Sequence, residues 1–593
     1  MKSIRIGHEA SSGDEVRLPI NSFRTHYHII GGTGKGKTTA LHTMLHPLFL
    51  DPLENSCFFV IDRLGNFSEE LLLWMASDYC TDRVRRRLLY LQPARDDVVA
   101  PFNPLMCANK NEEYFRVERT TEIILRAWES VNIEAMPRLA RWTTNAFLAA
   151  SKLGLTISDC SHFLLPASPY HSRLMEMLPS GLQTEWADIT SARSADATRL
   201  LESSRNRLKP YFDNDVLRRM FGTTESCVNV QRMMEEGRIV IVDLSPRNRL
   251  SAQTSNAIGA LLINEIIATI RNLPRTVRYP TYLFLDEFQN FVGPDLEHAL
   301  PETRQMGLNL ILSHQSFSQL QRGDYDMTDM IFTAQSRMIF GVQGEDADLL
   351  ANEIASIRYD PRKVKEEIYS RRQLNKGQKI VELHNRSTTR TTGDSIGESD
   401  QEGQSENQSI HGDPFAYGTY GRTYPDNQTQ GKGKNTTRGR SRGSSSSYSE
   451  SESVNQTLVP EYEEFSELSS RTYETFEEQR QVWAREIRNL KTGRAILRLV
   501  NDPRLHLVDV KRSTPGFLSY DIQTIARKFP QAIESMDKLL AQNFASDFFV
   551  PAEVIDRQSQ ERLDRLLQSN VKLNRTPNAE LAPEPDPEKN PFS

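Results

Sequence analysis

Two segments of the chain carry residues that could bind and hydrolyse a nucleoside triphosphate. The first contains the phosphate-binding pattern G-x-x-x-x-G-K-[ST] and consists of Gly31, Gly32, Thr33, Gly34, Lys35, Gly36, Lys37, Thr38 and Thr39. In such a loop the backbone amides cradle the phosphates, the lysine neutralises the β- and γ-phosphates, and the hydroxyl binds Mg²⁺. The pattern therefore predicts a nucleotide-binding loop in which Lys37 contacts phosphate and Thr38 is a metal ligand.

The second segment places two carboxylates, Asp286 and Glu287, directly after the apolar residues 282–285. One carboxylate at such a strand end can hold Mg²⁺ through water, and the other can act as the base or orient the attacking water. We assign the first role to Asp286 and the second to Glu287. A glycine-rich loop alone could be a tight turn, and an Asp-Glu pair alone could be a solvated strand end. Together they predict Mg-dependent ATP hydrolysis.

Alternating strands and helices are predicted around these two segments. The loop lies between an apolar strand, Tyr27–Ile30, and a helical stretch, 39–50. Short apolar runs bounded by polar or turn residues are typical of buried parallel strands, and they occur at 57–62, 88–92, 238–244, 281–286, 308–313 and 336–342. Helical patterns at 68–76 and 255–270 lie between them. The order of elements predicts an α/β fold with a mostly parallel sheet.

Other segments interrupt this core. Residues 109–227 show helical patterns, at 120–128 and 139–152, and predict an all-helical insertion that packs on the core or contacts a substrate or partner. Residues 387–460 are poor in apolar residues and rich in Ser, Thr, Gly, Gln and Asn, so they predict a disordered insertion, either a solvated linker or a segment that contacts nucleic acid.

The core resumes after this insertion. A helix at 477–490 and a strand pair at 495–500 and 506–510 are expected to form the far edge of the same sheet. The predicted core therefore comprises residues 1–108, 228–386 and 461–515. Residues 516–593 are expected to be a helical C-terminal extension with a disordered tail.

The composition of the chain bears on its partners, its redox environment and its relation to membranes. The 593 residues carry a formal net charge of −6, which does not exclude nucleic acid, because a ring needs positive charge only along its channel. The five cysteines are widely spaced, which favours reduced thiols over disulfides or a zinc site. The sequence has no signal-peptide pattern and no apolar run long enough to span a membrane. We therefore expect a cytoplasmic protein without direct membrane insertion.

These motifs together resemble the FtsK–HerA superfamily of ring ATPases, and within it the ATPase part of TraG/TraD-type conjugative coupling proteins of type IV secretion, without their transmembrane part. The resemblance spans about residues 1–385 and 465–515. It rests on the loop at 31–39, Val-Ile-Asp-Arg-Leu-Gly at 60–65, Pro-Phe-Asn-Pro-Leu at 101–105, Leu-Asp-Glu-Phe-Gln at 285–289, Arg-Gln-Met-Gly-Leu at 304–308 and His-Gln-Ser at 314–316. Lys35 departs from the pattern, since the family usually has serine there.

The resemblance implies a RecA-like P-loop core that binds ATP and Mg²⁺, with further site residues. Gln315 would sense the γ-phosphate, although it could simply cap a strand end. Arg304 would be the finger that reaches a neighbouring subunit's nucleotide, although it could instead pair with Glu302 at the surface. Arg337 is the second candidate for the finger. Asp62 would orient the site or merely end its strand.

The resemblance also implies a homo-hexameric ring that translocates DNA without reading its sequence. A relaxase, a secretion channel or a nuclease is the expected protein partner. The alternative is an ATPase ring that regulates or moves a protein partner without translocating DNA. The cluster Arg83-Val84-Arg85-Arg86-Arg87 is a candidate basic patch for DNA, and a solvated helix face is the other interpretation of it.

Overall fold

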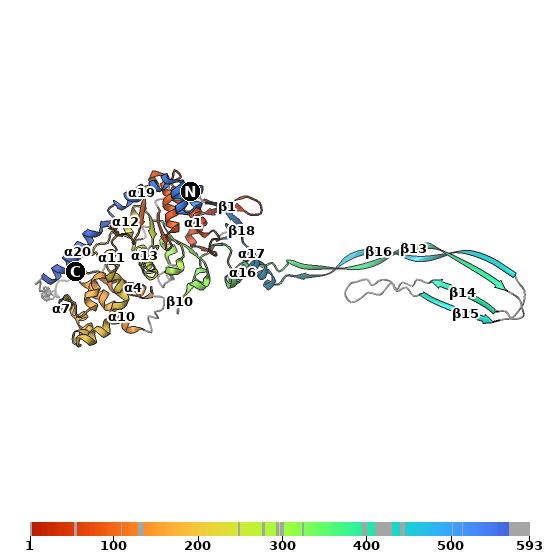
Figure 1. Ribbon diagram of the computed structural model, residues 1–593, viewed down its shortest axis with the longest axis horizontal. Helices are drawn as coiled ribbons and strands as arrows, with labels where there is room; N and C mark the ends of the chain where they lie inside the picture. The colour runs from red at the N-terminus through yellow and green to blue at the C-terminus, as the bar shows by residue number, and fades with distance from the viewer. Residues whose placement is uncertain are drawn as a thin grey trace, which may run out of the picture. The chain divides into compact units, whose positions relative to one another are not determined.

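The computed structural model describes residues 3–568, except 52–55, 108–109, 128–135, 247–249, 275–278, 292–295, 297–301, 323–324, 394–399, 409–429, 439–444, 501 and 513 (Figure 1). The chain forms two compact units. One comprises residues 1–359 and 476–593, and the other comprises residues 360–475. The predicted tail beyond residue 568 lies outside the described residues.

The larger unit is built on an eleven-stranded sheet, in the order β2-β1-β18-β17-β12-β3-β9-β8-β4-β7-β5. Its strands are β1 (Ser3–Glu9), β2 (Glu15–Pro19), β3 (Tyr27–Ile30), β4 (Cys57–Asp62), β5 (Leu88–Leu91), β7 (Ile239–Asp243), β8 (Thr281–Leu285), β9 (Leu308–His314), β12 (Ser336–Ile339), β17 (Arg494–Leu499) and β18 (Asp502–Val510). The strands from β12 to β5 are parallel. Those from β12 to β2 are antiparallel. The predicted α/β fold with a mostly parallel sheet is confirmed.

Both faces of the sheet are covered, which explains the continuous apolar runs of its central strands. In β4, Cys57, Phe59 and Ile61 belong to one hydrophobic cluster, whereas Phe58 and Val60 belong to another. The helices α13 (Ala252–Asn272), α16 (Gly344–Arg358) and α17 (Phe476–Arg488) contribute to the first cluster. The helices α1 (Lys37–Leu50) and α2 (Asn66–Ala76) contribute to the second. The sheet is thus the middle of three layers.

The described residues between 110 and 227 are helical, as expected. They form α4 (Glu113–Arg126), α5 (Pro137–Lys152), α6 (Ser161–Leu164), α7 (His171–Met177), α8 (Ser180–Glu185), α9 (Ala187–Thr190), α10 (Ser194–Asp213) and α11 (Asp215–Met220). A short α12 (Val230–Glu235) then leads into β7. These helices extend the first hydrophobic cluster, so the insertion and the core share one apolar interior.

The antiparallel side of the sheet differs from the expectation at its edge. The predicted pair, now β17 and β18, joins β12 as expected, but β1 and β2 continue the sheet beyond it. The sequence pattern predicts no strand in these N-terminal residues. Their apolar residues alternate with polar ones, as in β2, where only Val16 and Leu18 are buried. A strand with one solvated face gives this weaker pattern.

The C-terminal extension protects the opposite edge of the sheet. It contains α18 (Ile522–Lys528), α19 (Pro530–Phe544) and α20 (Ala552–Gln568). The side chain of Asn543 accepts a hydrogen bond from the amide of Tyr90 in β5 (2.8 Å) and donates one to its carbonyl (2.9 Å). This side chain satisfies backbone groups that an edge strand would otherwise expose. Among the described helices, none is long and apolar enough to cross a membrane.

The smaller unit is an antiparallel ribbon of β13 (Val364–Gly393) and β16 (Ser445–Tyr473), with a second strand pair, β14 (Asp400–Gln408) and β15 (Gln430–Arg438). The sequence pattern predicts that the core continues to residue 386 and that residues 387–460 are disordered. Residues 394–399, 409–429 and 439–444 of that segment lie outside the described residues, and its two ends, 387–393 and 445–460, are paired strands. Serine and threonine carry no core signal, yet they fit a ribbon whose two faces are both exposed.

Candidate nucleotide-binding site

The glycine-rich loop connects β3 to α1 and is held by two backbone contacts from other parts of the sheet. The amide of Gly32 donates to the carbonyl of Gly341 (2.9 Å), and the amide of Gly493 donates to the carbonyl of Lys35 (2.9 Å). Gly36 has a φ of 116°, and a Cβ there would come within 3.2 Å of the Cα of Gly493. Only glycine fits at this close, left-handed approach. These contacts therefore fix the shape of the loop.

Lys37, the first residue of α1, points back into the loop. Its Nζ donates to the carbonyl of Gly31 (2.7 Å), and the side chain is 7% exposed. Burial lowers the pKa of Lys37, while the charges of Glu287 and Asp286 act in the opposite direction. The cation is thus already placed between the loop and the two carboxylates.

The departure at Lys35 leaves this arrangement intact. Its half-buried side chain lies against Gly341, where a Cβ would come within 3.4 Å of the lysine Cε. Thr38, the second residue of α1, and the next residue, Thr39, are half-buried at the start of that helix. The helix N-terminus favours anions through its free amides.

Asp286 follows β8 and is a buried carboxylate with an unmatched oxygen. Its side chain is 7% exposed, and its Oδ1 has no hydrogen-bond partner among the described residues. Burial, with the neighbouring charges of Asp62 and Glu287, raises the pKa of Asp286 to about 7. A buried carboxylate whose oxygen lacks a hydrogen-bond partner suits a cation. Among the described residues, no group of three His, Cys, Asp or Glu side chains could hold a metal by itself. The Asp286 carboxylate and the Thr38 hydroxyl are oxygen donors, which Mg²⁺ prefers.

Glu287 is held in an uncommon backbone conformation. Its φ is 52°, in the left-handed region that non-glycine residues rarely adopt. Its side chain is 7% exposed, and its two carboxylate oxygens accept from Gln289 Nε2 (2.6 Å) and Gln315 Nε2 (2.7 Å). Residues held in such conformations are concentrated at functional sites. The unusual backbone of the turn after β8 therefore orients this carboxylate toward Gln289 and Gln315.

Gln315 connects the two predicted segments. It directly follows β9, donates to Glu287, and its Oε1 accepts from Thr33 Oγ1 in the loop (3.0 Å). A chain of side chains thus runs from the phosphate-binding loop through Gln315 to the carboxylate after β8. The sequence pattern places Gln315 one strand from the site, and the structure brings it into contact. The contact of Thr33 with Gln315 was not predicted, because no motif encodes a contact between loops so far apart in sequence. The local contact of Gln289 with Glu287 was not predicted either.

Asp62 ends β4 and supports the turn that follows. Its carboxylate accepts from the amides of Leu64 (2.9 Å) and Ser68 (2.8 Å), and burial raises its pKa. Of the two sequence-based interpretations, these contacts favour a structural role at the strand end. Its charge nevertheless acts on the neighbouring Asp286.

The two arginines proposed as fingers differ in position. Arg304 lies in the short helix η5 (Thr303–Met306) just before β9, and its side chain lies outside the described residues. Glu302, the partner proposed for it in the surface interpretation, pairs with Arg271 at 2.9 Å.

Arg337 is fully buried, which corrects its interpretation as a second candidate finger. It donates to His28 Nδ1 (2.8 Å) and to the carbonyl of Ile331 (3.2 Å), and it pairs with Glu353. A cation enclosed in this way does not reach a neighbouring subunit.

Arg337 belongs to a buried polar chain that the sequence motifs do not predict. His28 Nε2 lies 2.6 Å from His314 Nε2, and His314 Nδ1 donates to the carbonyl of Ser316 (3.1 Å), next to Gln315. Burial lowers the pKa of His28 well below its usual value and that of His314 to about 3, so both rings are neutral. The one sequence signal was a histidine inside the apolar run of β3. This chain of polar side chains fixes the C-terminal end of β9, which Gln315 directly follows.

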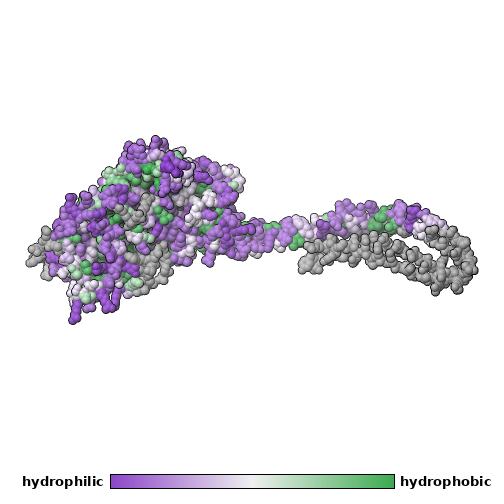
Figure 2. Space-filling model, viewed as in Figure 1, coloured by the Kyte–Doolittle hydropathy of each residue, from purple (hydrophilic) through white to green (hydrophobic). Residues whose placement is uncertain are grey.

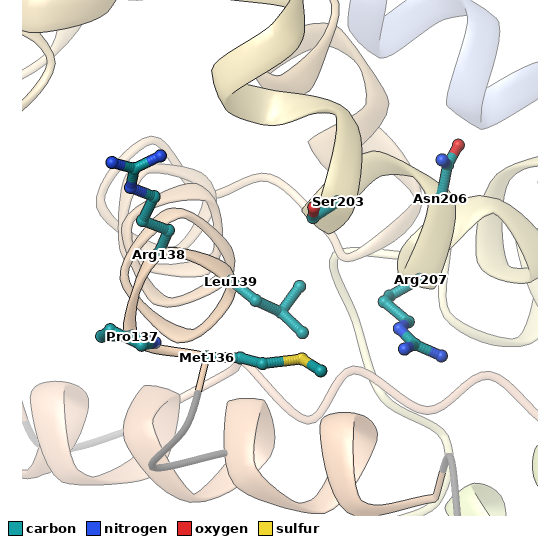
Figure 3. A pocket seen from close by; sticks show the side chains of 7 residues that line it. All are labelled: Met136, Pro137, Arg138, Leu139, Ser203, Asn206 and Arg207. Atoms are coloured by element: carbon teal, nitrogen blue, oxygen red, sulfur yellow. The ribbon is translucent and has the colours of Figure 1, made fainter. Parts of the chain in front are cut away.

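A separate cavity lies in the helical insertion. It has a volume of about 660 Å³ and is lined by Met136, Pro137, Arg138, Leu139, Ser203, Asn206 and Arg207. Figure 3 shows Met136 and Leu139 pointing from the start of α5 toward α10, whereas Arg138 points away. None of its walls comes from the elements that carry the loop or the carboxylates, so it is not part of the nucleotide site.

Comparison with known families supports the resemblance drawn from the motifs. Residues 280–410 match the family described as the TraM recognition site of TraD and TraG. This range begins at β8 and includes Asp286, Glu287 and Gln315. A search of curated proteins found no match.

Solved structures of similar proteins include two of a coupling protein. The bacterial conjugative coupling protein TrwBdeltaN70 in its unbound monoclinic form is 14% identical, with a TM-score of 0.46, over 87% of this chain and 89% of that one. The plasmid coupling protein TrwB in complex with ADP and Mg²⁺ is 13% identical, with a TM-score of 0.45, over 87% and 94%. VirB4 of Thermoanaerobacter pseudethanolicus is 12% identical, with a TM-score of 0.37, over 60% and 88%.

At such low identities and TM-scores, these likenesses add nothing to what the sheet itself establishes. The fold assignment therefore rests on the strand order and on the loop between β3 and α1. The motif resemblance to TraG/TraD-type coupling proteins is confirmed by the family match over residues 280–410.

Proposed function

We propose that this chain is a Mg-dependent ATPase that assembles into a hexameric ring and translocates DNA, as a coupling-protein-like or HerA-like motor. The observation that carries the proposal is the side-chain connection from Thr33 through Gln315 to Glu287, whose backbone is held in the left-handed region. It joins a phosphate-binding loop to the carboxylate to which we assign activation of the attacking water. The phosphate-binding loop with Lys37 and the buried carboxylate of Asp286 support ATP and Mg²⁺ as cofactors.

We assign each residue of the site a role in ATP hydrolysis. The loop amides and Lys37 bind the phosphates and offset their charge. Glu287 orients the attacking water and accepts its proton, and Gln315 reports the presence of the γ-phosphate to it. Thr38 and Asp286 would hold Mg²⁺, which when bound neutralises charge on the phosphate oxygens. Arg304 would complete the site of a neighbouring copy, so that hydrolysis depends on assembly.

DNA would be held by its backbone, without base readout. In the candidate basic patch at residues 83–87, Arg83 and Arg86 are exposed, whereas the other two arginines support the fold. Arg87 donates to the carbonyls of Gly237 and Ser56, and Arg85 to those of Met75 (2.8 Å) and Ser77 (2.7 Å). We place the protein in the cytoplasm, with a relaxase, a secretion channel or a nuclease as its partner.

The test is the ATPase rate of the purified chain with and without single- and double-stranded DNA. Wild type should be stimulated by DNA, and Glu287→Gln should lose hydrolysis by a factor of about 100 or more while still binding nucleotide. Arg304→Ala by itself should lose ATP hydrolysis. When it is mixed with Glu287→Gln, part of the hydrolysis should return, because each variant supplies the side chain that the other lacks. Arg17→Ala, an exposed arginine of β2, is the matched control.

Three outcomes would count against parts of the proposal. Hydrolysis that is indifferent to DNA would favour a ring that acts on a protein partner. Full activity of Arg304→Ala would remove this residue as the finger. Failure of Glu287→Gln to slow hydrolysis would remove the assigned base.

A further inference from the structure

The ribbon of β13 and β16 has two long strand edges that no described strand pairs. The two strands pair with each other from Val364 and Tyr473 to Gly393 and Ser445, and they form a sheet of two strands only. In such a pair, every second amide and carbonyl of each strand points away from the partner strand. Each edge therefore offers a row of free backbone groups, which is a template for another strand.

The faces of the ribbon expose apolar side chains along its length. Figure 2 shows hydrophobic residues on its surface among hydrophilic ones. Large exposed residues on the two strands include Ile368, Tyr369, Leu374, Ile380, Val381, Leu383, Val454, Leu458, Val459, Tyr462, Phe465 and Leu468. Leu374 is 59% exposed, and Ile380 and its cross-strand partner Leu458 are 56% and 57% exposed. A lone two-stranded sheet that buries so little is marginally stable, and further strands would stabilise it.

The two strands carry opposite charge. β13 contains seven basic residues (Lys365, Arg371, Arg372, Lys376, Lys379, Arg386 and Arg390) and three acidic ones (Glu366, Glu367 and Glu382). β16 contains six acidic residues (Glu450, Glu452, Glu461, Glu463, Glu464 and Glu467) and one basic residue, Arg471. Within the ribbon these charges already pair across the strands, for example Lys376 with Glu463 (2.9 Å) and Arg372 with Glu467 (3.2 Å).

We propose that ribbons of neighbouring copies of this chain join edge to edge, with β13 of one copy against β16 of the next. Because the strands of one ribbon are antiparallel, this join is antiparallel as well, and it repeats the basic-against-acidic pattern found within each ribbon. Joins of like edges, β13 to β13 or β16 to β16, place like charges opposite each other and are disfavoured. The occupant of each edge is therefore the unlike edge of a second copy.

Such a contact is head-to-tail, and this has a geometric consequence. Head-to-tail contacts generate a closed ring when the rotation between copies closes. A sheet that continues from copy to copy around a ring closes into a barrel and leaves no free edge. The inference rests on the ring assembly of the proposed function.

Pro460 in β16 has no N–H and removes one donor from the ribbon, so one hydrogen bond along that strand is missing.

Hydrogen exchange resolved to single residues tests the join. In separate ribbons, the amides of β13 and β16 should alternate between slow and fast exchange, since every second amide faces solvent. In joined ribbons, successive amides should all exchange slowly. The full-length chain would be compared at low concentration without nucleotide and at high concentration with a non-hydrolysable ATP analogue. Sedimentation velocity would report separately whether the chains assemble.

A pair of proline substitutions gives a second test that needs no knowledge of the register. Of two successive strand residues, one amide faces the partner strand and the other faces the outer edge. Ile380→Pro and Val381→Pro both alter exposed side chains, so neither removes buried packing. If the edges are joined, both variants should weaken assembly by about fivefold or more per contact, one through the ladder within the ribbon and one through the join. If the edges are free, both variants should assemble like wild type, because the ribbon then makes no contact between copies.

The outcomes separate this inference from the proposed function. Assembly with alternating fast amides would overturn the joined ribbons and leave the motor intact. Absence of any assembly would overturn both. Uniformly slow exchange that appears only with added DNA or with anionic vesicles would show that another partner covers the edges, and would overturn the proposal for a second copy.

Discussion

At the scale of single residues, Asp286 shows a conflict between stability and function. Burial and the charges of Asp62 and Glu287 raise its pKa to about 7 in the folded chain, above the value of about 3.9 expected when unfolded. The folded state then binds this proton more tightly, so the free energy of unfolding falls as the pH rises from about 4 to 7. The site therefore costs stability at neutral pH when no cation is bound.

This predicts that Asp286→Asn stabilises the nucleotide-free protein while it abolishes Mg-dependent hydrolysis. The gain should be about 2 kcal/mol above pH 7 and should vanish below about pH 4, where wild type is protonated as well. Thermal unfolding across this pH range measures it. Asp97→Asn is the control of opposite sign, because Arg95 lowers the pKa of Asp97. A gain independent of pH would contradict the assigned pKa.

A second prediction concerns the backbone of Glu287. Because its φ is 52°, Glu287→Gly should be more stable than Glu287→Ala by about 1 kcal/mol, since only glycine adopts this conformation without strain. Both variants lose the same side-chain hydrogen bonds, so the difference isolates the backbone. Chemical denaturation of the two variants measures it. Equal stabilities would show that the turn relaxes when the side chain is removed.

The sequence was sufficient to single out the groups that we propose to react, because their chemistry demands fixed local spacing. Lys37, Thr38, Asp286 and Glu287 all belong to short motifs. What could not be predicted are contacts between motifs, such as Thr33 with Gln315, because these depend on β9 lying next to both β3 and β8. The burial of Arg337 was missed for the same reason, since it follows from packing and not from local sequence.

At the scale of elements, the polar chain from Glu353 through Arg337, His28 and His314 ties α16 to the strand ends of the site. Arg337 is fully buried and also lies over the ring of Phe332 at 4.5 Å. A second arginine, Arg498 on β17, binds the other oxygen of Glu353 but is partly exposed. The two arginines bind the same carboxylate, one fully buried and the other partly exposed. Substituting each in turn therefore compares a buried with an exposed ion pair.

Arg337→Met should therefore destabilise the fold by about 3 kcal/mol, because it leaves His28 and buried groups without their partner. Arg498→Met should cost about 1 kcal/mol or less, because its charge is screened by solvent. Urea denaturation of both variants measures the difference. Arg337→Met should also slow hydrolysis with little effect on nucleotide affinity, since the chain reaches Ser316 beside Gln315. Equal costs for the two variants would contradict the assigned roles.

Elements were predictable in proportion to their burial. The parallel strands of the sheet are buried along their whole length and were found within a few residues. The strands β1 and β2 have a solvated face, and the ribbon is exposed on both faces, so hydrophobic pattern gave little warning of either. Pairing between distant strands, as in the ribbon, leaves no local signal in an unaligned sequence.

At the scale of the whole molecule, a site completed by a neighbour makes activity depend on concentration. We predict that ATP turnover per chain rises with protein concentration to a plateau, and that Arg304→Ala stays low throughout. Serial dilution with a coupled ATPase assay, alongside sedimentation, measures it. Turnover that is constant across the assembly range would show that each chain hydrolyses ATP alone.

The two ends of the ribbon insertion lie side by side. The amide of Glu474 donates to the carbonyl of Lys363 (2.9 Å), and their side chains pair at 3.0 Å. The chain thus leaves and re-enters through neighbouring residues, as it would at a tight turn. For protein engineering, residues 363 and 474 are therefore suitable junctions. A fluorescent reporter or a ribbon of another length could replace the residues between them without redesign of the flanking chain.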